Sequence, residues 1–389
     1  MAFILRKTLV LNNIRQYHRH LALTDTSAFK VKNKEALLKV LPEVIDTVCK
    51  GPTLSTQPKV ANWVKDMLEY ILLGASLRRA NDVTAAYVMF ESPENITEEK
   101  IHSSHILGWC TEMTYAFGCI VDDIMDSASL RRNKLCWYRR PNVGVNAVND
   151  TILLHQAILE ILEIKFGHTP EYTDLVKIVN NAIYVFGIGQ QLENFTVYTK
   201  KRNNLDCFTF ENFKNIAIRK AAYATTKYPL LLGLTLMKDR QKKAKKEWID
   251  ICLDIGPLYQ IHANYVTNLL INLHFCYQND YSDVYEKESE SGKTGNDIQE
   301  GKLTWLALTA LPRCNEQQLA TFKEFYGSPD PEHVKQIKQI YDDLKLPKLY
   351  EESESKMYNE LLGRIRALPT EPERKFFLNL LGEWYKAGY

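Results

Sequence analysis

The sequence predicts an all-α fold, and two features of its residue pattern lead to that prediction. Apolar residues recur at spacings of three and four over long stretches, as they do in amphipathic helices, whereas a clean two-residue alternation is hard to find. Glycine and proline are sparse, at 17 and 14 of 389 residues, so few breakers interrupt those stretches. A chain of this length can bury a large core as one domain. We therefore expect a single bundle of helices.

Several stretches illustrate this helical periodicity, and polar joints rich in breakers separate the helical stretches without marking a domain boundary. These stretches are residues 36–48, 60–73, 101–124, 174–192, 341–344 and 356–368. Elsewhere, the sequence of residues 271–281 is similar to that of residues 255–265. This similarity reflects either an old duplication of a half-helix or a chance likeness between two apolar helix faces.

The composition excludes some classes of partner. The formal net charge is +2, and no basic stripe with interleaved aromatic residues is present, which argues against nucleic acid as the main partner. No apolar run is long enough to cross a bilayer. The eight cysteines form no CxxC pair and have no regular spacing, so we expect free thiols in a reducing compartment.

The first residues differ in composition from the rest of the chain, because basic residues occur there without any acidic residue before Asp25. The basic residues are Arg6, Lys7, Arg15 and Arg19. This composition fits a mitochondrial transit peptide, and a disordered leader without a targeting signal fits almost as well. We expect a leader over residues 1–28, one domain over residues 29–389, and a location that is either mitochondrial or cytoplasmic.

An acidic cluster lies at the end of the 101–124 stretch. Asp122 and Asp126 are four residues apart, so on a helix they lie on one face and can bind the same divalent ions. Mg²⁺ takes oxygen ligands, keeps several waters and bridges protein carboxylates to substrate phosphates. Arg131 and Arg132 follow, and guanidinium groups match phosphate oxygens in geometry. The pattern predicts a site that binds a diphosphate.

The residues around this cluster resemble the farnesyl diphosphate synthases, which belong to the trans-isoprenyl diphosphate synthases. The likeness extends from about residue 35 to the C-terminus. It is carried by Gly108-Trp109-Cys110, Asp122-Asp123-Ile124-Met125-Asp126, Arg131-Arg132, Cys136-Trp137-Tyr138 and the segment from Gly292 to Gln299. The resemblance implies the isoprenoid synthase helical bundle with a central active-site cavity. It also implies a homodimer and three Mg²⁺ ions that hold an allylic diphosphate.

The resemblance assigns roles to single residues. Lys220 matches the family lysine that contacts the allylic diphosphate, Lys293 matches the lysine of the Gly-Lys segment, and Gln190 matches a glutamine in the cavity wall. The family's second aspartate motif lies fourteen residues before that second lysine. This chain has Asn279 there in place of the first aspartate, and it keeps Asp283. Because an amide oxygen can still bind Mg²⁺, the expected metal ligands are Asp122, Asp126, Asn279 and Asp283.

The family's site for its second substrate, isopentenyl diphosphate, is largely absent. In the family this site includes a Gly-Gly-Lys-x-Asn-Arg turn and a glutamine. Here Ala75 replaces the lysine, Leu77 the asparagine and Tyr115 the glutamine, while Arg78 and Arg132 remain. A hydrogen bond to a charged group contributes about 1.5–3 kcal/mol, so losing three partners would lower affinity at least about a thousandfold. We therefore expect isopentenyl diphosphate to bind too weakly to be a substrate.

The floor of the family's pocket for the allylic chain consists of two aromatic residues, which here are Phe117 and Gly118. With one ring lost, either the pocket is deeper and takes a longer chain, or a neighbouring side chain fills the space. We expect the deeper pocket, in which the rings of Tyr115 and Phe117 stabilise carbocations.

These observations favour a terpene synthase, as in the insect enzymes that derive from this synthase fold. It would ionise farnesyl diphosphate with Mg²⁺, and attack by the cation's own double bonds would give a sesquiterpene or sesquiterpene alcohol. The alternatives are a farnesyl diphosphate synthase with an unusual second site, and a non-catalytic homologue that pairs with an active subunit. The expected catalytic residues are Asp122, Asp126, Arg131, Lys220 and Lys293. The expected substrate-binding residues are Arg78, Arg131, Arg132, Lys220, Lys293, Gln190, Tyr115, Phe117 and Gly118.

Overall fold

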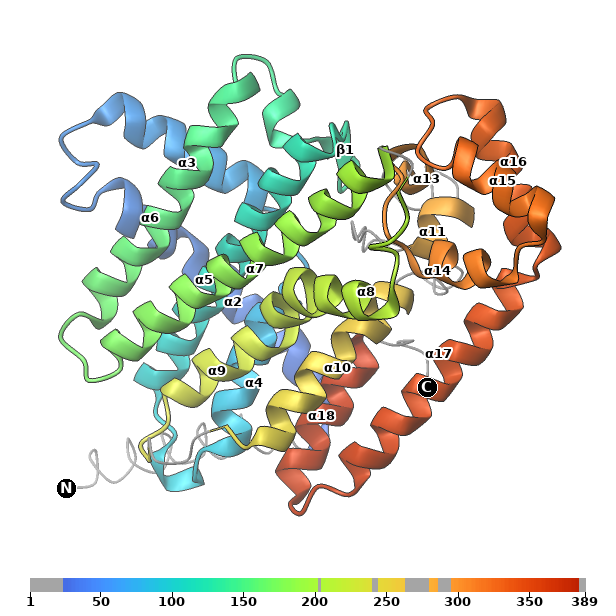
Figure 1. The fold of residues 1–389 in the computed structure, drawn as a ribbon. Helices are drawn as coiled ribbons and strands as arrows, with labels where there is room; N and C mark the ends of the chain where they lie inside the picture. Colours follow the sequence, from blue (N-terminus) through green and yellow to red (C-terminus); the bar gives the residue numbers. More distant parts are fainter. Residues whose placement is uncertain (1–23, 202–203, 240–243, 263–279, 286–294, 385–389) are drawn as a thin grey trace, which may run out of the picture.

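The computed structural model describes residues 24–201, 204–239, 244–262, 280–285 and 295–384, and its regular structure is almost entirely helical (Figure 1). The all-α prediction is therefore confirmed. The helices of the first half are α2 (Thr26–Cys49), α3 (Pro58–Leu72), α4 (Arg78–Phe90), α5 (Glu98–Met125), α6 (Ala147–Phe166) and α7 (Tyr172–Lys201). Those of the second half are α8 (Phe210–Ile216), the π-helical segment η4 (Ala217–Lys227), α9 (Tyr228–Thr235), α10 (Lys246–His262), α11 (Asp280–Tyr285), α13 (Asp297–Glu300), α14 (Trp305–Ala310), α15 (Glu316–Phe325), α16 (Pro331–Asp343), α17 (Leu346–Arg366) and α18 (Glu371–Trp384). Short 3₁₀ turns are η1 (Pro93–Asn95), η2 (Trp137–Arg139), η3 (Gly144–Asn146) and η5 (Leu311–Arg313).

Helix α5 is buried along most of its length and packs against α2, α4, α6, α7 and α9. The hydroxyl of Thr97 caps its N-terminus by accepting the Lys100 N–H. Within the helix, the Trp109 indole N–H donates to the Leu37 carbonyl of α2 at 2.8 Å, so this large side chain is buried without losing its hydrogen bond. The helix ends at Met125, and the bundle therefore holds the acidic cluster at the end of a deeply buried helix.

The apolar core of the described residues consists of two clusters. The larger joins the helices of the first half with α9, α10, α18 and the end of α17, and the smaller lies among α8, α11, α13–α16 and the start of α17. In Figure 1 the orange helices of the smaller cluster gather at one end, and the red α17 runs from that end back along the bundle. Asp126 at the end of α5 contacts Lys302 just after α13. The acidic cluster therefore lies where these two parts of the protein meet.

A short β-hairpin follows α5 and departs from the all-helical prediction. Strands β1 (Leu130–Arg131) and β2 (Lys134–Leu135) pair in antiparallel fashion. The two residues between them, Arg132 and Asn133, both have positive φ, at 54° and 56°, which is typical of a type I′ turn. Strands of two residues cannot show an alternating pattern, so periodicity does not reveal them.

The remaining predictions about organisation have different outcomes. Helix α2 begins at Thr26, inside the predicted leader, while residues 1–23 lie outside the described residues, so the leader and the domain boundary stay predictions. The second of the two similar segments, residues 271–281, also lies largely outside them. The seven cysteines in the described part of the chain are free thiols, as predicted. Among the described helices, none has the length and apolar character needed to cross a membrane.

Candidate active site

Asp122 and Asp126 lie one helical turn apart at the end of α5, as the sequence predicts, and the Asp126 N–H donates to the Asp122 carbonyl at 2.8 Å. Both side chains are buried, at 6% and 7% exposure. The C-terminus of a helix carries partial negative charge, which makes it an unfavourable place for carboxylates. Burial adds a further cost unless cations lie close by. These two carboxylates therefore require nearby cations or metal ions.

A third carboxylate, Glu193 of α7, completes the acidic cluster. Ligand oxygens of Asp122, Asp126 and Glu193 lie within 4.8 Å of one another. Three converging carboxylates are the donor set that Mg²⁺ takes, and they leave room for waters and substrate phosphates. Gln190, one turn earlier on α7, is 2% exposed, and its amide atoms have no hydrogen-bond partner among the described residues. An unpaired buried amide costs about 1–3 kcal/mol, so Gln190 also favours a site that holds a bound group.

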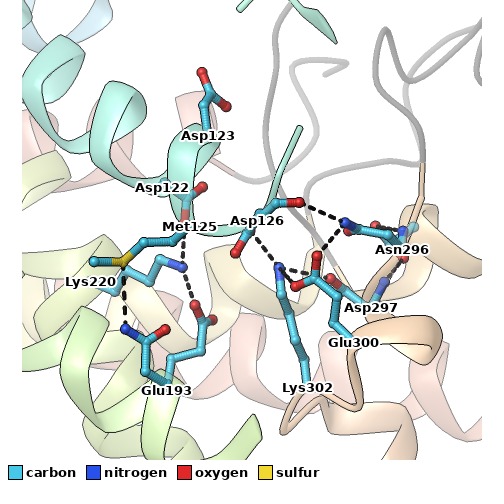
Figure 2. Close-up of polar contacts among 12 residues, drawn as sticks. Asp122, Asp123, Met125, Asp126, Glu193, Lys220, Asn296, Asp297, Glu300 and Lys302 are labelled. Atoms are coloured by element: carbon cyan, nitrogen blue, oxygen red, sulfur yellow. Dashed lines mark hydrogen bonds and ion pairs between the residues drawn. The ribbon is translucent and has the colours of Figure 1, made fainter. Parts of the chain in front are cut away.

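Two lysines, the buried Lys302 and the largely covered Lys220, neutralise the acidic cluster (Figure 2). The Lys220 ammonium lies 2.7 Å from Asp122 Oδ1 and also pairs with Glu193. The Lys302 ammonium lies 2.7 Å from Asp126 Oδ2. It also faces two carboxylates of the α13 turn, at 3.4 Å from Asp297 and 3.5 Å from Glu300. Lys302 was not among the residues predicted from the sequence.

The charges in this cluster shift the pKa values of its members. Burial by itself raises the pKa of the Asp122 carboxyl, but Lys220 and Lys302 outweigh burial and hold that pKa below its ordinary value. Burial raises the pKa of Glu193 despite the same two lysines. Burial alone would lower the pKa of Lys220, but Asp122 and Glu193 raise it overall. Asp122 is therefore ionised and Lys220 charged in the protein at neutral pH.

The position of Lys220 depends on a close approach between α7 and η4. A Cβ at Gly189 of α7 would stand 2.7 Å from the Lys220 backbone nitrogen and 2.9 Å from Arg219 Cβ, so only glycine allows this approach. Lys220 lies in the π-helical segment η4, and π-helical segments are rare and frequently occur at functional sites. The close contact brings Lys220 beside Glu193, which follows Gly189 by one turn.

Arg131, at the end of β1, binds the opposite side of the acidic cluster. Its Nη2 lies 2.6 Å from Asp123 Oδ1 and 3.3 Å from Asp122 Oδ2, and its Nε donates to Asp123 at 2.7 Å. Asp123 therefore faces Arg131, whereas Asp122 faces both Arg131 and Lys220. The hairpin turn at Arg132 and Asn133 positions this arginine.

A first cavity adjoins the acidic cluster and contains most of the predicted substrate-binding residues. It is lined by Arg79, Thr114, Tyr115, Phe117, Gly118, Cys119, Asp122, Arg131, Ile183, Phe186, Lys220, Ala221, Ala224 and Thr225. Arg79 was not among the predicted residues, while Arg78, to which the resemblance assigns the family arginine, is not among the residues that line this cavity. Arg79 is 1% exposed, and its guanidinium lies 3.6 Å from the centre of the Tyr115 ring. Arg79 follows Arg78, the first residue of α4, and the role assigned to Arg78 stays a prediction.

A second cavity lies on the other side of Arg131. It shares Cys119 and Arg131 with the first cavity and has apolar walls that include Leu73, Ile120 and Trp137. Arg132 and Lys134 also line it. Lys134 is exposed, lies 5.8 Å from the centre of the Tyr70 ring, and forms no ion pair with the described residues. The second cavity therefore combines an apolar wall with cationic groups.

The floor of the first cavity differs from the prediction of a deeper pocket. A Cβ at Gly118 would stand 3.0 Å from Cε2 of the Phe186 ring, so that ring of α7 fills the space beside the glycine. The alternative in which a neighbouring side chain replaces the lost ring is therefore the correct one. Sequence alone could not identify Phe186, because a phenylalanine at helical spacing looks like any core residue.

The second predicted metal site is only partly described. Asp283 is buried, and its two carboxylate oxygens accept the backbone N–H groups of Asn296 and Asp297, at 3.1 and 2.8 Å. It is not part of the acidic cluster found among the described residues. Asn279 and Lys293 lie outside the described residues, so their roles stay predictions.

Comparison with known proteins gives a consistent result. Residues 61–344 match the family described as Polyprenyl synthetase. A farnesyl pyrophosphate synthase of Panax ginseng is 31% identical over 353 residues, which cover 91% of this chain and 98% of the relative. A protein of Arabidopsis thaliana named farnesyl pyrophosphate synthase 1, mitochondrial, is 30% identical over 93% of this chain and 90% of its own length. The solved structure of T. brucei farnesyl diphosphate synthase complexed with risedronate is 25% identical, with a TM-score of 0.81 over 92% of this chain and all of that one.

Proposed function

Because the chain belongs to the polyprenyl synthetase family, we propose that it is a prenyltransferase that condenses isopentenyl diphosphate with an allylic diphosphate to form farnesyl diphosphate. The names of its relatives support this activity, since the plant relatives and the T. brucei enzyme are all farnesyl diphosphate synthases. Their similarity extends over nine-tenths of the chain.

The prediction of a terpene synthase is wrong. It is overturned by the relatives, which are named as synthases of farnesyl diphosphate and not as enzymes that consume it. The descent from an insect-type terpene synthase has no support in these comparisons. The prediction relied on counting three lost partners of isopentenyl diphosphate in the sequence, and it did not count cations supplied from elsewhere in the fold. Lys134, which lines the second cavity beside Arg132, is such a cation.

One observation carries the proposal: two cavities flank Arg131 and share it. A condensation needs two substrates side by side, whereas the conversion of a single allylic diphosphate needs only one cavity. The first cavity joins apolar walls to the acidic cluster and Lys220, which suits an allylic diphosphate. The second joins apolar walls to Arg132 and Lys134, which suits the smaller isopentenyl diphosphate.

The charged residues support ionisation of the allylic substrate. Asp122, Asp126 and Glu193 would hold Mg²⁺, which the family uses and which would neutralise the leaving diphosphate. We expect three ions, with Asn279 and Asp283 contributing as the resemblance implies. Lys220, Lys302 and Arg131 lie beside the same carboxylates and would bind the oxygens of the diphosphate. Lys293 is assigned the same role from the resemblance alone.

The reaction then proceeds between the two cavities. The C1–O bond of the allylic substrate breaks, and its electron pair leaves with the diphosphate. The terminal double bond of isopentenyl diphosphate attacks C1, and loss of a proton from its C2 restores a double bond. The products are an allylic diphosphate longer by five carbons, diphosphate and a proton. Holding both reactants in adjacent pockets makes this attack effectively intramolecular.

An exposed apolar stripe supports the predicted homodimer. Val145 in the turn η3 and Val148 and Ile152 at the start of α6 are 83%, 51% and 58% exposed, and the spacing of four residues places Val148 and Ile152 on one face of the helix. Apolar stripes of this kind mark interfaces between proteins. Light scattering should give twice the chain mass of 45.0 kDa, and Ile152→Asp should shift the protein toward monomer.

The mitochondrial reading of the leader is supported by one relative. The Arabidopsis thaliana protein carries the word mitochondrial in its name. Basic residues without acidic ones before Asp25 have the composition of such leaders. A fluorescent protein fused after residue 28 should enter mitochondria, and cytoplasmic fluorescence would instead favour the leader without a signal.

The second cavity provides the test of the proposed reaction. Lys134→Ala should raise KM for isopentenyl diphosphate about tenfold, because one charged contact of about 1.5 kcal/mol is lost, and should leave KM for geranyl diphosphate unchanged. Lys348→Ala is the matched control, since Lys348 is 75% exposed on α17. Wild-type protein that incorporates no isopentenyl diphosphate would show that the proposed function is wrong.

A further inference from the structure

We propose that Phe186 sets the length of the prenyl product, by supplying from α7 the ring that the family carries at the position of Gly118. This inference deepens the proposed prenyltransferase function and rests on it. It assigns a specificity-determining role to a residue outside the region where the resemblance places the pocket floor.

The geometry at Gly118 is the first observation. A Cβ added there would meet three atoms of the Phe186 ring and no closer neighbour: Cε2 at 3.0 Å, Cζ at 3.1 Å and Cδ2 at 3.4 Å. The edge of the ring therefore lies directly over the backbone of α5. Phe186 is 9% exposed, so the ring is held by its surroundings. The two helices can carry one ring at this point, but not two.

The second observation is the neighbourhood of Phe186. Its ring makes an edge contact with Phe117, with centroids 6.5 Å apart and an angle of 78° between the planes. Phe117 is fixed in turn by His155 of α6, at a centroid distance of 6.4 Å. Phe117 and Phe186 thus form a continuous aromatic surface built from α5 and α7, and both line the first cavity.

The position of this surface relative to the charged end of the cavity gives it a function. Phe117 and Gly118 precede Asp122 by five and four residues, which is about 6–7.5 Å along the helix axis. A substrate whose diphosphate lies at Asp122 and Lys220 would extend its hydrocarbon chain along this direction. It would meet the aromatic surface after a limited number of isoprene units. The ring of Phe186 should therefore stop growth of the product.

Phe186 also shares a face of α7 with the active-site residues. It precedes Gln190 by four residues, so both point toward the same side of the helix. Tyr184, two residues before Phe186, is 70% exposed and points away. An aromatic residue at position 186 can therefore reach the cavity, whereas one at position 184 cannot.

The test is a double-mutant cycle with product analysis. The four proteins are wild type, Phe186→Ala, Gly118→Phe and the double variant, each given Mg²⁺, labelled isopentenyl diphosphate and geranyl diphosphate. After removal of the diphosphate, the alcohols are separated by chain length. Wild type should stop at C15. Phe186→Ala should raise the ratio of C20 and longer products to C15 by at least tenfold.

The exchange of the two rings gives the more specific result. Gly118→Phe alone should lose activity or stop at C10, because its Cβ would stand only 3.0 Å from the Phe186 ring and a second ring must fit beside the first. Gly118→Phe combined with Phe186→Ala should return to C15 products, since one ring again occupies the floor. Strong non-additivity of this kind is expected only for side chains that share one space. Tyr184→Ala is the control on the same helix and should leave the product length unchanged.

Folding is checked by circular dichroism and thermal unfolding of every variant. A folded Phe186→Ala protein that still makes only C15 would overturn the inference, and so would a Gly118→Phe defect that is the same with and without Phe186. If wild type incorporates no isopentenyl diphosphate, the proposed function fails first. The inference is then tested by thermal shifts with Mg²⁺ and non-hydrolysable geranyl, farnesyl and geranylgeranyl diphosphate analogues. Phe186→Ala should gain a shift with the longest analogue, and no gain would overturn the role of Phe186.

Discussion

The ammonium group of Lys302 lies 2.7 Å from the carboxylate of Asp126, and both side chains are only 6% exposed. This ion pair joins two residues 176 positions apart, one at the end of α5 and one just after α13. Burial alone would lower the pKa of Lys302, but Asp126 and Asp297 hold it well above its ordinary value. Lys302 is therefore a permanent cation inside the acidic cluster.

Loss of this cation should destabilise the protein most strongly when Mg²⁺ is absent. Lys302→Ala leaves Asp126 buried without its partner, and breaking a buried pair in this way costs about 3–5 kcal/mol. The midpoint temperature of thermal unfolding, measured in EDTA, should fall by roughly 10 °C. Mg²⁺ should restore part of this temperature by binding the same carboxylate. Lys335→Ala, whose side chain is 76% exposed, is the control. Equal shifts for both variants would show that the buried pair does not stabilise the fold.

The acidic cluster should determine the response to Mg²⁺. Asp122→Ala and Asp126→Ala should lower turnover by roughly a thousandfold or more, because ionisation of the substrate depends on the metal. Glu193→Gln should keep the fold but raise the Mg²⁺ concentration needed for half-maximal activity, since Glu193 shares the site. Steady-state rates across a Mg²⁺ titration measure both effects. An unchanged titration for Glu193→Gln would remove Glu193 from the metal site.

The approach of η4 to α7 should depend on the absence of a side chain at Gly189. Gly189→Ala places a Cβ 2.7 Å from the Lys220 backbone, so Lys220 must move. Overpacking of this kind costs about 1–3 kcal/mol, and we expect turnover to fall by at least tenfold. Gly187→Ala is the matched control two residues earlier, where a Cβ meets nothing within 4 Å. That control should be neutral or slightly stabilising, and a similar loss in both variants would refute the role of the close contact.

Glu300 should make the metal-free protein less stable as the pH rises. Burial is the main reason that the pKa of Glu300 rises from 4.5 to about 7. The positive charge of Lys302 lowers this pKa, whereas the negative charges of Asp126 and Asp297 raise it. Between pH 4.5 and about pH 7, Glu300 holds a proton in the folded protein that it has released in the unfolded chain. The stability contributed by Glu300 is therefore full below pH 4.5 and is lost as the pH rises through 7.

Glu300→Gln removes this titration and should show the effect directly. In EDTA, the variant should gain about 1–2 kcal/mol relative to wild type at pH 8, after allowing for solvent screening, and much less at pH 5. Denaturant unfolding at the two pH values measures the difference. A gain that is the same at pH 5 and pH 8 would mean that Glu300 has no raised pKa.

The sequence predicted the helices and the arrangement of Asp122 and Asp126, because both depend on local periodicity. It did not predict Lys302, Phe186 or the partnership of Arg79 with Tyr115. Each of these depends on contacts between distant segments, and each residue type is common on ordinary helices. The terpene synthase prediction, which the relatives contradict, relied on matching single positions of a family motif. Such matching finds the partners that are lost, but it does not find charged residues outside the motif, such as Lys134 of β2.

Incubation with defined substrates tests the central claim most directly. Purified protein with Mg²⁺ is given either labelled isopentenyl diphosphate with geranyl diphosphate, or farnesyl diphosphate alone, and Asp122→Ala protein serves as the inactive control. The account predicts label in a C15 diphosphate from the first mixture and no hydrocarbon or alcohol from the second. Sesquiterpenes from farnesyl diphosphate alone, without incorporation of isopentenyl diphosphate, would contradict it, and turnover of neither mixture would favour the non-catalytic homologue.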